Sequence, residues 1–122
     1  MDTQAGQDHE RAPRPAHTPD ALRAALAVVA PTRLPEMQRT KDEAFNHAVA
    51  FQSLIPLMCW VYDWARDIEI ARRPDLSARY ERAQQHLENE DPAAAQKALG
   101  EMSAVRREAV RAANVQGPAA PE

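Results

Sequence analysis

Apolar residues recur at steps of three and four positions through most of the chain, and this spacing predicts amphipathic helices. Prolines divide the pattern into segments. The first segment begins at Thr18-Pro19, where a threonine N-cap precedes a proline whose missing N–H costs nothing. Its apolar face consists of Leu22, Ala25, Leu26 and Val29. Pro31 ends this short helix.

The next two segments are longer. Thr32 is a suitable N-cap for a second helix that continues to Gln52, with Pro35 inside its first turn. The apolar face of this helix is formed by Met37, Ala44, Phe45, Ala48 and Phe51. Ser53 is the expected cap of a third helix, which ends near Pro74. The third helix carries one broad stripe made of Leu54, Leu57, Met58, Val61, Trp64, Ala65, Ile68 and Ala71. Further apolar residues lie outside this stripe, so we expect the third helix at the centre of a bundle.

Two more helices are expected in the second half of the chain. Asp75 is the expected cap of a fourth helix over 75–87, and Asp91-Pro92 opens a fifth over 91–113. The fourth helix has an a/d pattern of Leu76, Tyr80, Ala83 and Leu87. The face of the fifth is formed by Ala95, Leu99, Met102, Val105 or Arg106, Ala109 and Ala113. The sequence has no alternating run of β-branched residues and no Asn-Gly or Asp-Gly turn. The pattern therefore predicts an all-α fold, a small four- to five-helix bundle.

Both ends of the chain are poor in large apolar residues. Residues 1–17 combine two prolines with scattered charge, and 114–122 are similar, so neither segment can offset its ordering entropy. We therefore predict a single helical domain over 18–113 between a disordered N-terminal tail and a disordered C-terminal tail. Alanine accounts for 25 of the 122 residues, so the core must be built from few large side chains.

Charge and cysteine content exclude several classes. A net charge of −3 gives no general attraction to nucleic acid or to anionic membranes. The single cysteine, Cys59, rules out an internal disulfide and a cysteine-rich zinc site, and we expect it to be inert and partly buried. The longest apolar stretch, near 48–62, is too short and too interrupted to cross a bilayer. No signal peptide is visible, so a cytoplasmic protein without a cofactor is expected.

The third helix holds both tryptophans, and this suggests a protein-binding surface. The expected surface is an exposed apolar edge of Leu57, Trp60 and Trp64, rimmed by charged residues. The rim consists of Asp63, Arg66 and Asp67. The alternative is that both indoles pack in the core, which has few other large residues. If the chain self-associates, the a/d face of the helices over 75–87 and 91–113 is the expected seam.

Two further functions follow from charged residues. Arg72, Arg73, Arg79 and Arg82 form a candidate nucleic-acid patch, which would make the protein a DNA-binding regulator. Asp63 and Asp67 lie one turn apart and could hold a divalent cation in a metal-dependent enzyme. The simpler interpretation of the arginines is a solvated face of mixed charge, and that of the two aspartates is the polar side of an apolar helix. Since no catalytic motif accompanies these residues, we do not expect an enzyme.

Glu43 and His47 are also one turn apart, but a di-iron bundle uses a Glu-x-x-His spacing and repeats it on two helices. A surface ion pair is the expected role of this pair.

The segments TPDALRAAL, DEAFNHAV, SLIPLMCWVYDWA and RRP, within residues 17–74, occur in an order that resembles a family of small actinobacterial proteins of unknown function. This resemblance assigns no site residues. It implies an interaction protein rather than an enzyme, in the company of small regulatory or toxin–antitoxin-like genes. The sequence thus favours a small helical protein–protein interaction or regulatory module, such as an antitoxin-like accessory protein.

Overall fold

The computed structural model describes residues 11–88 and 91–115, and the predicted tail residues 1–10 and 116–122 lie outside this range. The elements, in chain order, are α2 (Pro19–Val29), the short 3-10 helix η1 (Pro31–Arg33), α3 (Leu34–Phe51), α4 (Ile55–Arg72), α5 (Pro74–Leu87) and α6 (Pro92–Ala113). No strand occurs within the described residues. The predicted all-α fold is confirmed.

Two helix starts coincide with the predicted caps. The hydroxyl of Thr18 accepts a hydrogen bond from the Ala21 N–H at 3.2 Å, and the carboxylate of Asp91 accepts one from the Ala93 N–H at 3.2 Å. In both cases proline occupies the first helical position. The combination of a capping side chain and a following proline was therefore a reliable signal.

Three other predicted caps are wrong. Thr32 lies inside η1, and α3 begins two residues later at Leu34. Ser53 does accept a hydrogen bond from the Ile55 N–H at 3.1 Å, but Leu54 occupies the N-cap position of α4. Asp75 lies in the first turn of α5, because Pro74 already begins that helix. Proline is the first residue of α5 and the second residue of α3 and of α4, so each helix begins at or directly before a proline.

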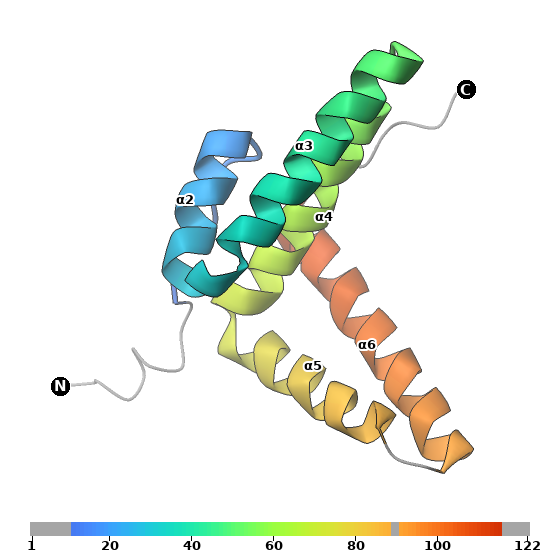
Figure 1. Cartoon of the computed structure of the whole chain (residues 1–122). Helices are drawn as coiled ribbons and strands as arrows, with labels where there is room; N and C mark the ends of the chain where they lie inside the picture. The colour runs from blue at the N-terminus through green and yellow to red at the C-terminus, as the bar shows by residue number, and fades with distance from the viewer. Residues whose placement is uncertain (1–10, 89–90, 116–122) are drawn as a thin grey trace, which may run out of the picture.

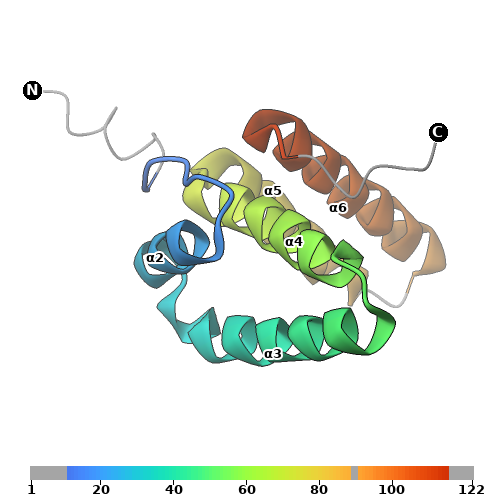
Figure 2. The same ribbon diagram turned by 90° about the horizontal axis from the view of Figure 1, so that it is seen from above.

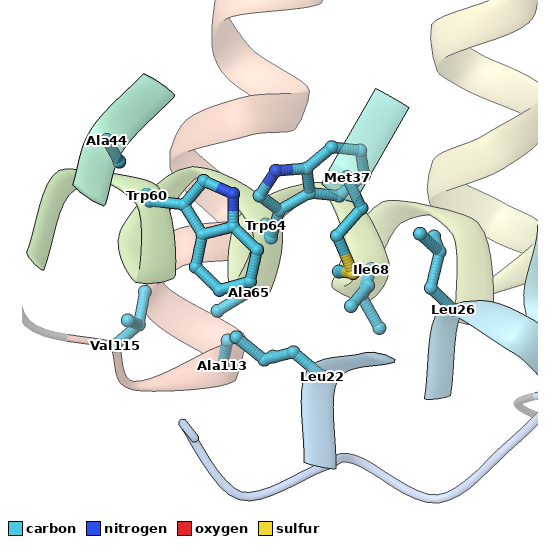
Figure 3. Close-up of a cluster of buried hydrophobic side chains, with 10 residues drawn as sticks. All are labelled: Leu22, Leu26, Met37, Ala44, Trp60, Trp64, Ala65, Ile68, Ala113 and Val115. Atoms are coloured by element: carbon cyan, nitrogen blue, oxygen red, sulfur yellow. The ribbon is translucent and has the colours of Figure 1, made fainter. Parts of the chain in front are cut away.

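Helix α4 lies at the centre of the molecule, as predicted. It contacts every other α-helix of the described chain. In Figure 2, α3 lies on one side of α4 and α6 on the other, while α2 closes one end of the gap between α3 and α4. The main core surrounds Trp60 and Trp64 and receives Leu22 and Leu26 from α2, and Met37 from α3 (Figure 3).

Helices α5 and α6 form a second hairpin with its own core. Leu76 of α5 packs with Val105 and Ala109 of α6, and Ala83 packs with Met102 closer to the connection. The a/d faces of the two helices are thus paired within one chain. Most residues of these faces are buried within one chain, although Leu99 is 53% exposed, and the expected homo-oligomer seam stays a prediction.

Residues 11–17, which the sequence assigns to the N-terminal tail, lie against the end of α4. We call this segment the strap. The guanidinium of Arg14 donates two hydrogen bonds to the carboxylate of Glu69, at 3.0 and 2.8 Å. The Arg11 backbone N–H donates to the Arg72 carbonyl at 2.7 Å. The side chain of Glu69 is 1% exposed, so the strap supplies part of the compensation that a buried carboxylate requires.

The C-terminal boundary also differs from the predicted one. Asn114 ends α6 in the left-handed region at φ 55°, and Val115 after it is buried in the main core. Both residues had been assigned to the predicted tail.

Candidate interaction surface

The predicted tryptophan surface is buried. Trp60 and Trp64 are 5% and 4% exposed, because α3 covers the face of α4 on which they lie. Both indole N–H groups donate to the hydroxyl of Thr40, at 3.1 and 3.2 Å. The same hydroxyl donates to the Glu36 carbonyl at 2.9 Å. The expectation of an exposed Trp60–Trp64 edge is therefore wrong, and the alternative of two core indoles is the observed one.

Thr40 was missed in the sequence, although a signal was present. It falls between Met37 and Ala44 on the apolar face of α3, where a polar residue needs a partner. A hydroxyl offers one donor and two acceptor positions, and Thr40 uses all three. This side chain makes the pair of buried indoles possible without an unsatisfied N–H.

The charged rim of the predicted surface is an ion-pair network. Arg66 contacts Asp67 at 3.0 Å and Asp63 at 3.6 Å, and Arg33 contacts Asp67 at 3.4 Å. Burial raises the pKa of Asp63, an effect that Arg66 opposes and the neighbouring Asp67 reinforces. Among the residues that the structure describes, no group of three or more His, Cys, Asp or Glu side chains could hold a metal ion. The two aspartates are thus engaged by arginines.

Glu43 and His47 have separate partners. Glu43 forms a surface ion pair with Arg39 at 2.9 Å, and not the expected one with His47. The ring of His47 lies 5.8 Å from that of Phe51, centroid to centroid, and not on the glutamate.

The predicted arginine patch is not a free cationic surface. Arg72 is 3% exposed and donates to both carboxylate oxygens of Glu69, at 3.1 and 3.0 Å. Arg73 donates to the carboxylate of Asp75 at 2.7 Å, and this hydrogen bond raises the pKa of the arginine. Both guanidinium groups are thus paired with carboxylates.

The remaining arginines of the predicted patch lie on α5. Arg79 contacts Glu101 and Glu108 of α6, each at 2.9 Å, and these hydrogen bonds raise its pKa. Arg82 is exposed. Sequence proximity grouped four cations, whereas the fold brings acidic residues of α6 to Arg73 and Arg79, and Arg72 pairs with Glu69 of its own helix.

A different part of the molecule presents apolar surface. The described chain has eight large hydrophobic residues that are strongly exposed, and six of them lie between positions 45 and 58. These six are Phe45 (58% exposed), Val49 (63%), Phe51 (69%), Leu54 (70%), Ile55 (54%) and Met58 (40%). They belong to the end of the hairpin where α3 turns into α4, which projects away from the α5–α6 hairpin in Figure 1. We call this end the α3–α4 tip.

Two hollows run along one side of the α3–α4 hairpin and share Phe45 and Leu57. The inner hollow has a volume of about 600 Å³ and is also lined by Pro19, Lys41, Asp42, Asn46, Trp60 and Val61. The outer hollow, at the tip, has a volume of about 320 Å³ and is also lined by Ala48, Val49, Gln52, Ser53 and Leu54. We call the two hollows together the α3–α4 trough, because Phe45 and Leu57 line both.

Apart from Pro19, Lys41 and Asp42, the residues that line the trough belong to a stretch without formal charge. From Ala44 to Tyr62 the sequence contains no Asp, Glu, Lys or Arg, although such residues make up 27% of the chain. This gap is the signal by which the surface could have been found, since interface centres are depleted in charged residues. Cys59, in the same stretch, is exposed and not partly buried as expected.

Across residues 11–88 and 91–115, none of the helices combines the length and the apolarity that a membrane crossing requires. Comparison with known protein families, with curated proteins and with solved structures finds no match to this chain. The resemblance of residues 17–74 to small actinobacterial proteins therefore stays a prediction.

Proposed function

We propose that this chain is a protein–protein interaction module that binds its partner through the α3–α4 trough. The observation that carries the proposal is the concentration of exposed apolar side chains at the tip, in a stretch without formal charge. Both hollows combine apolar lining residues with polar ones such as Lys41, Asp42 and Gln52, and amphipathic helices bind in hydrophobic grooves.

The size of the exposed surface supports this proposal. At about 150–200 Å² for a fully exposed large apolar side chain, the exposed fractions of Phe45, Val49 and Leu54, which line the trough, amount to roughly 300 Å². An apolar patch of about this size on a monomeric protein is often functional. Covering this area would contribute roughly 8 kcal/mol before the costs of association are subtracted.

The partner would define the cellular role. A regulatory or antitoxin-like accessory function belongs to this proposal, because such proteins act by covering a surface of another protein. DNA binding through Arg72, Arg73 and Arg79 has no comparable support, since acidic side chains already neutralise these groups.

The proposal is tested by affinity capture from the native host with matched variants. Val49→Lys and Leu54→Asp place a charge in the trough, whereas Val28→Lys and Leu99→Asp place the same charges at apolar positions of similar exposure on α2 and α6. We expect the trough variants to lose proteins that the wild type and the control variants retain. Circular dichroism would confirm that all four variants are folded. Identical sets of captured proteins from all five chains would contradict the proposal.

A further inference from the structure

The buried polar and charged side chains of the described residues lie together where α4 ends and α5 begins, and every one of them bonds to the strap. They are Glu69, Arg72 and Ser77, which we call the seat. The carboxylate of Glu69 accepts two hydrogen bonds from Arg14, at 3.0 and 2.8 Å. Arg72 donates to the Ala12 carbonyl at 2.9 Å, and the Ser77 hydroxyl accepts from the Arg11 guanidinium at 3.3 Å.

The seat is also held in place by its own helices. Arg72 donates to both carboxylate oxygens of Glu69, at 3.1 and 3.0 Å, and the Ser77 hydroxyl donates to the Ile70 carbonyl at 2.7 Å. None of these bonds involves the strap, so the seat keeps its geometry when the strap leaves. A preformed seat binds a ligand without the cost of ordering its groups.

The strap resembles a bound peptide more than a part of the core. None of residues 11–17 is buried or helical, and none belongs to the apolar clusters of the described chain. The contacts to the seat given above are hydrogen bonds and an ion pair, which a ligand with the same donors can replace. Pro13 and Pro15 favour an extended backbone, the conformation in which many peptides are recognised.

We propose that the seat is a binding site for an extended segment of another protein that carries the spacing Arg-x-x-Arg, and that the strap occupies this site as an internal substitute. The first arginine of the segment takes the place of Arg11 at Ser77, and the second takes the place of Arg14 at Glu69. The chemistry of the occupant is thus given by the residues that fit the seat. Because the seat lies at the opposite end of α4 from the tip, this inference does not rest on the proposed function.

The energetics of competition favour an unlike protein over the strap of a second copy. A strap from a second copy makes the same bonds as the chain's own strap, but it must compete with a segment that is tethered beside the seat. Tethering by a short flexible link corresponds to a roughly millimolar effective concentration. Exchange between copies gains no contact that offsets this advantage, whereas an unlike segment can make additional contacts.

A neighbouring hollow offers such contacts. It has a volume of about 490 Å³, and its lining includes Ala71 and Ser77. The Ala71 carbonyl and the Ser77 hydroxyl both accept a hydrogen bond from the Arg11 guanidinium, so the hollow lies beside the seat. No residue of the strap lines it. The lining combines Ile70 and Tyr80 with charged residues of both signs, so a segment that continues into the hollow makes contacts that the strap does not make.

Fluorescence anisotropy with a labelled synthetic peptide of residues 11–17, RAPRPAH, tests the site in the full chain. In the Arg11→Ala/Arg14→Ala variant the strap lacks both guanidinium groups and competes less well for the seat. We therefore expect the peptide to bind this variant at least about 10-fold more tightly than it binds the wild type. A control peptide with alanine in place of both arginines should not bind. If the variant is folded by circular dichroism and binds neither peptide at about 1 mM, or binds both equally, the inference is wrong.

Two substitutions locate the binding. Glu69→Gln in the same background keeps the shape of the side chain but removes its charge, so it should weaken peptide binding at least about 10-fold. Leu54→Asp lies at the tip and should leave peptide binding unchanged. The opposite pattern would overturn the assignment to the seat, because it would place the peptide in the trough.

Affinity capture from the native host separates an unlike partner from a second copy. Proteins retained by the Arg11→Ala/Arg14→Ala variant should be released by excess RAPRPAH but not by the alanine peptide. Sedimentation velocity of the wild type should show a monomer of 13.6 kDa. A wild-type dimer that dissociates in the Arg14→Ala variant would show exchange of straps and overturn the unlike occupant.

Amide hydrogen exchange in the wild type needs no variant and tests whether the strap leaves while the helices stay folded. The Arg11 N–H donates to the Arg72 carbonyl at 2.7 Å and reports on the strap, whereas the Ile68 N–H lies within α4 and reports on the fold. We expect the Arg11 amide to exchange at least about 100-fold faster than the Ile68 amide. Equal rates would overturn the inference, because the strap would then leave only when the whole protein unfolds.

Discussion

The hydroxyl of Thr40 supports the two core indoles, and its removal should destabilise the protein strongly. Thr40→Val keeps the shape of the side chain but leaves the Trp60 and Trp64 N–H groups without this acceptor. A buried donor that loses its partner costs about 1–3 kcal/mol. Because Thr40 is only half-buried and water can reach part of the site, we expect about 2–4 kcal/mol for the pair.

Urea unfolding followed by circular dichroism at one protein concentration would measure this loss. Thr40→Ser is the matched control, because it keeps the hydroxyl, and it should cost less than about 1 kcal/mol. In a Trp64→Phe background one of the two donors is already absent, so Thr40→Val should cost about 1–3 kcal/mol less than in the wild type. Equal losses for Thr40→Val and Thr40→Ser would refute the reasoning, as would a Thr40→Val loss unchanged by Trp64→Phe.

Three further predictions concern the strap and a helix end. Arg14→Ala leaves the Glu69 carboxylate with fewer hydrogen-bond donors, so it should lower the free energy of unfolding by about 1–3 kcal/mol. The control is Arg23→Ala on the exposed surface of α2, which should have little effect in the same urea titration. Burial opposes ionisation of Glu69, but Arg14 and Arg72 outweigh this effect and lower the pKa of the carboxyl group. The stabilisation from the ion pair is therefore fully present above the unfolded-state pKa of about 4.3. It is lost as the pH falls towards the lower pKa of the folded state. The difference between wild type and Arg14→Ala should therefore shrink below about pH 4, and a constant difference down to pH 2 would contradict the assignment. Gln52 has a φ of 51°, in the left-handed region that glycine adopts without strain. Gln52→Gly should therefore stabilise the protein by about 0.5–1 kcal/mol, which would raise the midpoint of thermal unfolding by a few degrees.

The helical content and two helix starts were predictable because they depend on local signals. Thr18-Pro19 and Asp91-Pro92 combine a cap with a proline, and neither requires knowledge of the rest of the fold. The central position of α4 was also predictable, since apolar residues on most sides of a helix need neighbours on most sides.

The spacing of apolar residues could not show which part of α4 each neighbouring helix covers. Leu54 and Ile68 belong to the same predicted stripe, yet they are 70% and 0% exposed. The difference arises because α2 and α6 cover the second half of α4, whereas its first turns project with the tip. A helical stripe therefore predicted a core face along its whole length, although only part of that face is covered.

Long-range ion pairs were likewise outside the reach of local reasoning. Arg14 and Glu69 are 55 positions apart, and Arg79 and Glu108 are 29 apart. Glu69 and Asp75 lie close in sequence to Arg72 and Arg73, but the carboxylates that pair with Arg79 could be identified only from the fold.

The separation between the strap and α4 also has a consequence for the order of folding during synthesis. Arg14 leaves the ribosome 55 residues before Glu69, an interval of roughly 3–11 s at about 5–20 residues per second. Helices α2 and α3 can form within this time, because helix formation takes microseconds or less. The strap cannot make its hydrogen bonds until the last turn of α4 has formed. Bringing the two segments together has an entropy cost that grows with the logarithm of the number of residues between them. Some of the first residues to be made are thus among the last in this half of the protein to reach their final position.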